Sequence, residues 1–224
     1  MFVELSYSIG AELTVMDENL EGPQVISRSR ICNGQKNNTS YLHLFAHTGT
    51  HIDVPWHFNE NGRQVLDFEI GEFVFWRVLL VDIITQAYQP ITLERLESLN
   101  TPISKSDALL IRTGFSRLRK ENKSLYIHGT PGLDLAAAEY LAGFPQLRCI
   151  GVDFISIENI ENARPLGYPV HHILLGRDIP MILLEDAKLQ VIKGEKIHRL
   201  FLFPLRIEGL EASPVTAVAE ILEE

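Results

Sequence analysis

The chain has 224 residues, of which 46% are hydrophobic and 22% are charged, proportions that are ordinary for a globular protein. Its formal net charge of −9 at pH 7 argues against nucleic acid or an anionic membrane as the main partner. Two cysteines far apart exclude a disulfide framework, and the opening MFVELSYSIG lacks the basic start of a secretory signal. The longest apolar run, residues 73–83, is too short to span a bilayer, so we expect a protein of the reducing cytoplasm.

In chain order, short apolar runs and alternating apolar and polar residues predict many strands and few helices. The predicted strands are residues 3–9, 24–31, 41–47, 73–83, 107–113, 146–153, 179–186 and 199–208. The predicted helices are residues 92–99, residues 135–142 behind an Asp134 cap, and the final run VTAVAEILEE after the helix-start pair of Ser213 and Pro214. No repeat or flexible linker divides the sequence. We therefore predict a single α/β domain over residues 1–224, with a strand-rich mixed sheet.

The stretch HTGTHIDVPWHF, residues 47–58, concentrates histidines in a chain that has only eight of them. Four of its polar side chains share odd numbering: His47, His51, Asp53 and His57. An extended chain would direct all four to one side, because its side chains repeat every second residue. The intervening glycine and the valine–proline pair oppose a helix here. His43 shares the odd numbering, and we expect it to have a structural or supporting role.

Imidazoles and a carboxylate that converge from one segment suit a divalent metal, with zinc, manganese or iron(II) favoured over magnesium or calcium. Three protein ligands, here His47, His51 and Asp53, leave a position open, as is typical of a catalytic site. His57 would then lie beside the metal, where an unligated imidazole can transfer protons. A lone histidine is more often an ordinary structural residue. Here four histidines and an aspartate all have odd numbers, and this shared spacing favours the metal site.

Further ligands are expected later in the chain, where His171 and His172 follow the turn-like PLGYPV. Glu185 ends an apolar strand, which is a costly place for an unpaired carboxylate, unless it begins a solvated turn. A histidine and this glutamate would complete a two-metal site bridged by Asp53. Of the two histidines we favour His171.

At these residues the sequence resembles a known family. HTGTHIDVPWHF is similar to the H-x-G-T-H-x-D-x-P-x-H signature of the cyclase superfamily, which includes bacterial kynurenine formamidase and isatin hydrolase. LLIRTGFSR (109–117), GVDFISIE (151–158), the histidine pair and GLEASPVTAV (209–218) are similar too, so the resemblance covers most of the chain. It implies a metal-dependent hydrolase with a swivelling β/β/α fold, assembled as a homo-oligomer, a dimer or a tetramer. The implied site residues are His47, His51 and Asp53 for the first metal, His171 and Glu185 for the second, and His57 as the catalytic histidine.

The resemblance predicts cleavage of a C–N bond in a small amide, such as the arylformamide N-formylkynurenine. Water activated by zinc or manganese, with one or two ions per subunit, would attack the carbonyl, and His57 would act as general acid and base. Two alternatives stay open: a hydrolase or dehydratase of a cyclic, isatin- or polyketide-like substrate on the same centre, and a metal-binding protein without turnover. Trp56 and Phe58 would line a pocket or belong to the core, and for Phe58 we favour the core.

Overall fold

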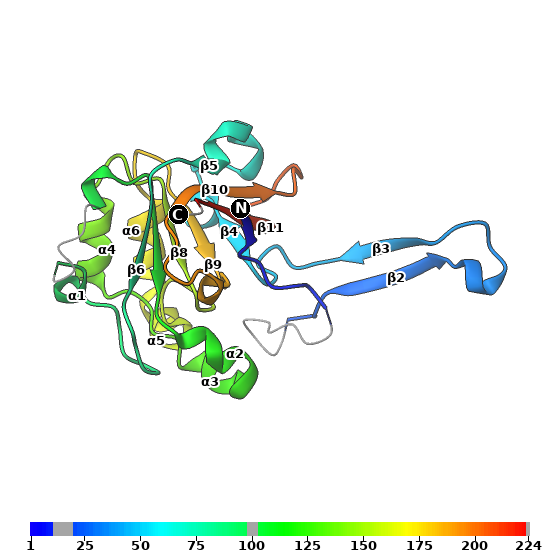
Figure 1. The fold of residues 1–224 in the computed structure, drawn as a ribbon, viewed down its shortest axis with the longest axis horizontal. Coiled ribbons are helices and arrows are strands. Elements are labelled where there is room, and N and C mark those ends of the chain that lie inside the picture. The colour runs from blue at the N-terminus through cyan, green and yellow to red at the C-terminus, as the bar shows by residue number, and fades with distance from the viewer. Residues whose placement is uncertain (11–19, 98–102, 223–224) are drawn as a thin grey trace.

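The computed structural model describes residues 1–10, 20–97 and 103–222, and a large mixed β-sheet lies at its centre (Figure 1). The order across the sheet is β5 (Val74–Phe75), β10 (Ile197–Pro204), β11 (Ala212–Ile221), β4 (His51–Asp53), β9 (Ile182–Glu185), β8 (Cys149–Val152), β7 (Ala108–Arg112) and β6 (Val78–Asp82), and β1 (Phe2–Glu4) also pairs with β11. The strands from β6 to β9 run parallel to one another, and the remaining pairs are antiparallel. The predicted mixed α/β class is confirmed.

Both faces of β7, β8 and β9 are buried, which explains why these strands read as continuous apolar runs. On β7, Leu109 and Ile111 belong to one hydrophobic core, whereas Ala108 and Leu110 belong to a second one. The sheet curls until β10 lies against β6, so it encloses the second core. The two pairs lie on opposite faces of the sheet, because successive side chains alternate along a strand.

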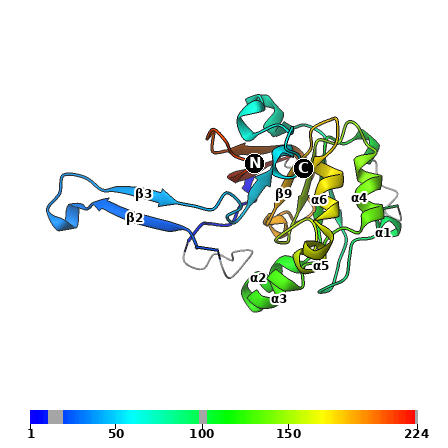
Figure 2. The same cartoon turned by 180° about the vertical axis from the view of Figure 1, so that it is seen from behind.

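Helices cover the outer face of the sheet and complete the first core (Figure 2). The longer ones are α4 (Leu135–Ala142) and α6 (Pro169–Leu175), which pack against each other, and the shorter ones are α1 (Leu93–Glu97), α2 (Leu118–Glu121), α3 (Lys123–His128) and α5 (Ile160–Ala163). The predicted cap of α4 is present, because the Asp134 side chain accepts a hydrogen bond from the backbone N–H of Ala137 at 2.8 Å. Among the described residues no helix is long and apolar enough to cross a membrane.

A two-stranded hairpin, β2 (Gln24–Ser29) with β3 (Thr39–His43), projects from the body of the molecule (Figures 1 and 2). Its strands pair with each other and, in the described part of the chain, with no other strand. We refer to residues 24–43 as the arm.

The predicted carboxyl-terminal helix is wrong, because residues 212–221 form strand β11. This strand pairs with β10 along one edge and with β4 and β1 along the other. Val215, Ala217, Ala219 and Ile221 alternate along it and enter the enclosed core. Two neighbouring edges and a buried face therefore override the helical propensity of the alanines and glutamates.

The predicted helix 135–142 has its predicted bounds as α4, and the other predicted elements are present with shorter or shifted bounds. The run 3–9 gives only β1, the run 41–47 ends as a strand at His43, and the run 73–83 divides into β5 and β6. The predicted helix 92–99 is α1 over Leu93–Glu97, and its last two positions lie outside the described residues.

Candidate metal centre

Strand β4 places two of the predicted ligands on one face. His51 and Asp53 flank Ile52, whose side chain enters the enclosed core, so the two polar side chains point to the opposite, outer face. The chain is not extended throughout residues 47–57 as predicted, because Gly49 turns it with a φ of +63°. His47 therefore reaches the other two across a turn, where glycine tolerates the left-handed backbone.

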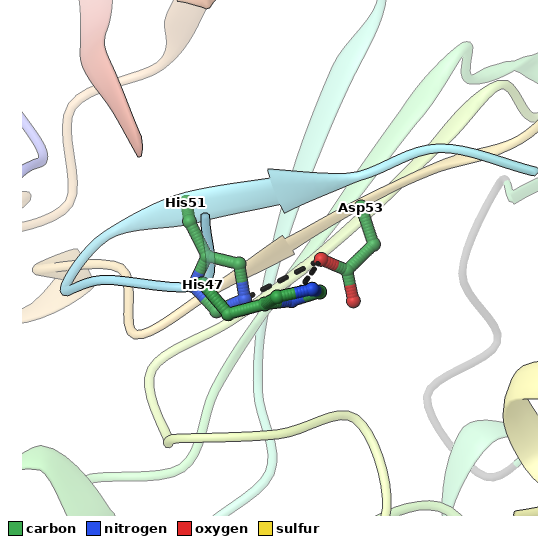
Figure 3. Close-up of side chains that lie close together, drawn as sticks. All are labelled: His47, His51 and Asp53. Atoms are coloured by element: carbon green, nitrogen blue, oxygen red, sulfur yellow. Dashed lines mark ion pairs between the residues drawn. The ribbon is translucent and has the colours of Figure 1, made fainter. Parts of the chain in front are cut away.

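These three side chains converge on one point (Figure 3). The Asp53 Oδ1 atom lies 2.9 Å from His47 Nδ1 and 3.4 Å from His51 Nε2. All three residues are at most 6% exposed. The convergence that the sequence predicted is present, although a turn produces part of it.

Strand β9 and helix α6 add a second imidazole–carboxylate pair. Glu185 is opposite His51 in the β4–β9 register, and its Oε2 atom lies 3.4 Å from His51 Nε2. The Nε2 atom of His171 lies 3.6 Å from Glu185 Oε1 and 4.0 Å from Asp53 Oδ2. Two donor groups result, His47–His51–Asp53 and Asp53–His171–Glu185, and within each the donor atoms lie within 4.8 Å of one another.

Each imidazole is anchored at one nitrogen, which leaves the other directed toward the carboxylates. His51 Nδ1 lies 2.9 Å from the carbonyl oxygen of Gly49, and His171 Nδ1 lies next to Glu158 Oε1 at 2.5 Å. His47 Nε2 lies 3.2 Å from Glu211 Oε1. A nitrogen that donates to such an acceptor leaves the second ring nitrogen with a lone pair, which is the form that binds a metal.

Sequence reasoning missed these two anchoring carboxylates. Glu158 and Glu211 both lie inside stretches of the family resemblance, 13 residues from His171 and 164 residues from His47, respectively. Their partners became evident only in the folded chain, where Glu158 also accepts hydrogen bonds from the backbone N–H groups of Val170 and His171.

Several atoms of the cluster that could coordinate a metal have no hydrogen-bond partner within the described part of the molecule. They are His47 Nδ1, His51 Nε2, both carboxylate oxygens of Asp53, and Glu185 Oε2. Asp53 Oδ1 and His47 Nδ1 are only 2.9 Å apart, yet they do not meet the angular requirement for a hydrogen bond. Buried polar atoms are normally satisfied, so five unsatisfied ones aimed at one another fit a shared cation.

The charges of the cluster also favour the binding of a cation. Burial lowers the pKa of His51, but Asp53 and Glu185 together outweigh it, through their negative charge and their close contacts with the ring, and hold the pKa well above the ordinary value. Burial also opposes the charged form of His171, yet Glu158 and Glu185 raise its pKa to about 9. The site therefore attracts positive charge, which protons supply in the absence of a metal.

His57 occupies a different position. It ends a 3₁₀ turn over Pro55–His57, its side chain is 26% exposed, and its Nε2 atom lies 3.9 Å from Asp53 Oδ2. It belongs to neither donor group. Burial lowers its pKa to about 4, so the ring is neutral at pH 7 and can accept a proton. His57 thus lies next to the cluster and outside both donor groups, and its role as the catalytic histidine stays a prediction.

A cavity of about 240 Å³ opens onto these groups. Its lining residues are Leu20, Phe45, His47, Asp53, His57, Phe58, Ser156, Ile160, Arg164, Tyr168 and His171. Phe58 both packs against the first core and lines the cavity, where its ring stacks on His171 with centroids 4.7 Å apart. Phe58 therefore belongs both to the core, as we favoured, and to the pocket.

The two remaining histidines of the prediction lie outside the cluster. His172 is exposed on α6, whereas the adjacent His171 is buried, which agrees with the preference for His171. His43 lies on the arm with its side chain 60% exposed, and it pairs with Glu21 at 3.5 Å.

Comparisons with known proteins agree with this geometry. Residues 3–159 match the family described as "Putative cyclase". The chain is 31% identical to the kynurenine formamidase of Bacillus mycoides over 81% of this chain and 79% of that protein, and 28% identical to cyclase-like protein 2 of Oryza sativa over 96% and 78%.

Solved structures share the fold. An isatin hydrolase bound to the product analogue thioisatinate has a TM-score of 0.83 and 17% identity, with 100% of this chain and 92% of that chain covered. A predicted metal-dependent hydrolase from Bacillus stearothermophilus has a TM-score of 0.74 and 23% identity, with 98% and 97% covered. The fold and the site thus define a cyclase-type hydrolase. The chain belongs to the cyclase family, alongside its kynurenine formamidase relatives.

Proposed function

We propose that this protein is a metal-dependent hydrolase that cleaves the C–N bond of a small amide, with an arylformamide such as N-formylkynurenine as the first candidate. The observation that carries this proposal is the pair of donor groups that share Asp53, with the neutral His57 beside them. The kynurenine formamidase relatives support the choice of substrate class.

The proposed ligands are His47, His51 and Asp53 for one divalent ion, and Asp53, His171 and Glu185 for a second. Imidazole with carboxylate suits zinc first and manganese second. A bound ion would supply Lewis acidity, which makes water a better nucleophile near neutral pH and stabilises negative charge on the substrate oxygen.

The protein's own residues supply position and proton transfer. His57 accepts a proton at Nε2 as water attacks the carbonyl, and it donates a proton to the leaving nitrogen as the C–N bond breaks. Phe45, Phe58 and Tyr168 line the cavity and offer aromatic surfaces for a ring-bearing substrate. The residues of the donor groups are at most 6% exposed, which limits access of bulk water.

The second candidate is hydrolysis of a cyclic amide such as isatin. The same donor groups and the same His57 would perform it, since opening a lactam also breaks a C–N bond. The fold likeness to an isatin hydrolase supports this candidate, at 17% identity. A metal-binding role without turnover is less well supported, because a structural site has no use for a neutral, partly exposed imidazole at 3.9 Å.

The test is hydrolysis of arylformamides and small lactams by protein loaded with zinc or manganese, compared with His57→Ala. We expect His57→Ala to bind metal as the wild type does and to lose about a hundredfold or more in kcat, the usual contribution of general acid–base catalysis. Full activity in His57→Ala would exclude the proton-transfer role. Metal binding without turnover of any amide would favour the binding role.

We also propose that the protein forms a homo-oligomer in the cytoplasm, with a small molecule as its substrate and neither nucleic acid nor a membrane as a partner. The arm supports the oligomer. Residues 24–43 carry three basic residues and no acidic one, which is a formal charge of +3. Because the net charge of the whole chain is −9, the rest of the chain carries −12. A basic, projecting hairpin is complementary to the acidic body of a second copy.

A further inference from the structure

Ser156 occupies an unusual position for a polar residue. It lies in the loop after β8, within the run Phe154–Ile157, where every residue is at most 2% exposed. Its neighbours in that run are apolar, yet Ser156 lines the same cavity as Asp53, His57 and His171. The chain thus places one polar residue at the wall of the cavity within an otherwise hydrophobic segment.

The Ser156 hydroxyl has no hydrogen-bond partner among the residues that the structure describes. A buried hydroxyl without a partner is unfavourable, because it has lost the hydrogen bonds that water would offer. Ser156 lines the cavity, so a molecule that fills the cavity and reaches this hydroxyl can supply the missing partner.

The backbone around this serine is fixed. The carbonyl oxygen of Phe154 accepts a hydrogen bond from the N–H of Asp186 at 2.9 Å, and the N–H of Ile157 donates to Glu185 Oε1 at 2.6 Å. Turning Ser156 away from the cavity would therefore disturb Glu185, one of the proposed ligands. The backbone that carries the hydroxyl is fixed before any ligand arrives, which is how a binding group should be positioned.

We infer that Ser156 is a substrate-binding residue whose hydroxyl hydrogen-bonds the amide group of the substrate. A hydroxyl donates one hydrogen bond and accepts others, so it can pair with the amide carbonyl or the amide N–H. The aromatic lining of the cavity takes the ring, and Ser156 selects a polar amide over a hydrocarbon of equal shape. This inference rests on the proposed amide hydrolysis for its substrate class.

The chain offers a matched control in Thr85. Its side chain is 2% exposed, and its Oγ1 atom also lacks a hydrogen-bond partner in the described ranges. Thr85 does not line the cavity. Ser156→Ala and Thr85→Val each remove one unsatisfied buried hydroxyl, and only the first removes it from the cavity.

The first experiment measures kinetics of the metal-loaded protein on the best arylformamide or lactam, together with metal content and melting temperature. We expect Ser156→Ala to lose about ten- to a hundredfold in kcat/KM, the range expected for a hydrogen bond to a polar or charged group. Metal content and melting temperature should match the wild type, and Thr85→Val should match it throughout. Unchanged kcat/KM in Ser156→Ala would overturn the inference. So would loss of metal or of folding, which would give the hydroxyl a structural role.

The second experiment measures binding rather than turnover. Calorimetry on the metal-loaded protein compares benzamide with toluene, which has the same aromatic ring but no amide. We expect Ser156→Ala to weaken benzamide about tenfold and to leave toluene unchanged. If the wild type hydrolyses no amide while this pattern holds, the proposed function fails and the role of Ser156 stands. If benzamide binds both proteins equally, or does not bind the wild type, the role of Ser156 is wrong.

Discussion

At the scale of single residues, the centre is built from histidines that are each held at one nitrogen. His171 is the most tightly held, with Nδ1 at 2.5 Å from Glu158 Oε1 and with both residues buried. Such a carboxylate fixes the orientation of a ligand and raises its basicity, so its effect on metal binding is large although it does not touch the metal.

Glu158→Gln is therefore expected to weaken metal binding at the group that contains His171 by about ten- to a hundredfold. The readout is a titration of metal-free protein with zinc, in which the second equivalent should bind more weakly. Glu161→Gln is the matched control, because Glu161 Oε1 lies 2.6 Å from His128 Nδ1 at the surface, away from the donor groups. Equal titrations of Glu158→Gln and wild type would contradict the positioning role.

Proton competition is a second consequence at this scale. The pKa of His171 is raised to about 9, above its ordinary value of 6.5, so metal-free protein carries a proton there at pH 7. A metal must displace that proton, and its affinity should rise with pH by about tenfold per unit until pH 9. Zinc titrations at several pH values test this, and calorimetry in two buffers should detect the released proton. An affinity that is flat between pH 6 and 9 would contradict it.

At the scale of elements, β9 joins the site to a buried ion pair. Asp186 follows Glu185 directly and adopts a φ of +51°. Arg119 of α2 donates to both of its carboxylate oxygens, and the Tyr126 hydroxyl donates to Oδ1 at 2.6 Å. The end of β9 is thereby fixed from the side opposite to the donor groups.

Arg119→Met should destabilise the protein by about 3–5 kcal/mol, because it leaves the buried Asp186 carboxylate without its cation. Arg119 and Asp186 have side chains only 9% and 2% exposed. Urea unfolding measures the change. The control is Arg199→Met, whose partner Glu220 lies on the neighbouring strand β11 and whose own side chain is 32% exposed, with an expected loss of about 0–1 kcal/mol. Similar losses of stability in both variants would show that burial does not determine how much an ion pair contributes to the stability of this protein.

The arm is the other element with a specific expectation. Val25 and Leu42 face each other across the hairpin and are 68% and 67% exposed, and Ile26 and Tyr41 form a second exposed pair on its other face. An isolated hairpin is only marginally stable in water, so we expect a second copy to cover these residues.

Val25→Ser combined with Leu42→Ser should shift the protein from oligomer to monomer, as measured by light scattering on a sizing column. Ser27→Ala, on the same strand β2, should leave the oligomer intact. A monomeric wild type would refute the role of the arm.

At the scale of the whole molecule, the donor groups join three distant parts of the chain. His51 and Asp53 come from β4, Glu185 comes from β9, and His171 comes from α6. Metal binding should therefore stabilise the entire fold by mass action. At a free metal concentration a hundredfold above Kd, the gain is about 2.7 kcal/mol, and chelation should remove it. Thermal unfolding with and without a chelator measures this gain, and equal melting temperatures would place the metal outside the folded core.

Much of this arrangement follows from local sequence, and the remainder depends on long-range packing. The odd numbering of His51 and Asp53 predicted their shared face, because strand periodicity is local. The anchoring roles of Glu158 and Glu211 could not be predicted, since nothing near them in sequence identifies their partners. The strand nature of residues 212–221 was hidden for the same reason, because two neighbouring edges decide it.

Asp53 closes both donor groups, with Oδ1 toward His47 and Oδ2 toward His171. One carboxylate cannot give its full negative charge to two cations at once. The first ion to bind would partly neutralise the negative charge of Asp53, so the carboxylate would attract the second ion less strongly. The two ions would also repel each other. We therefore expect the loading of two ions to be stepwise and anticooperative, so that a scarce supply of metal would give half-loaded protein rather than a mixture of full and empty molecules.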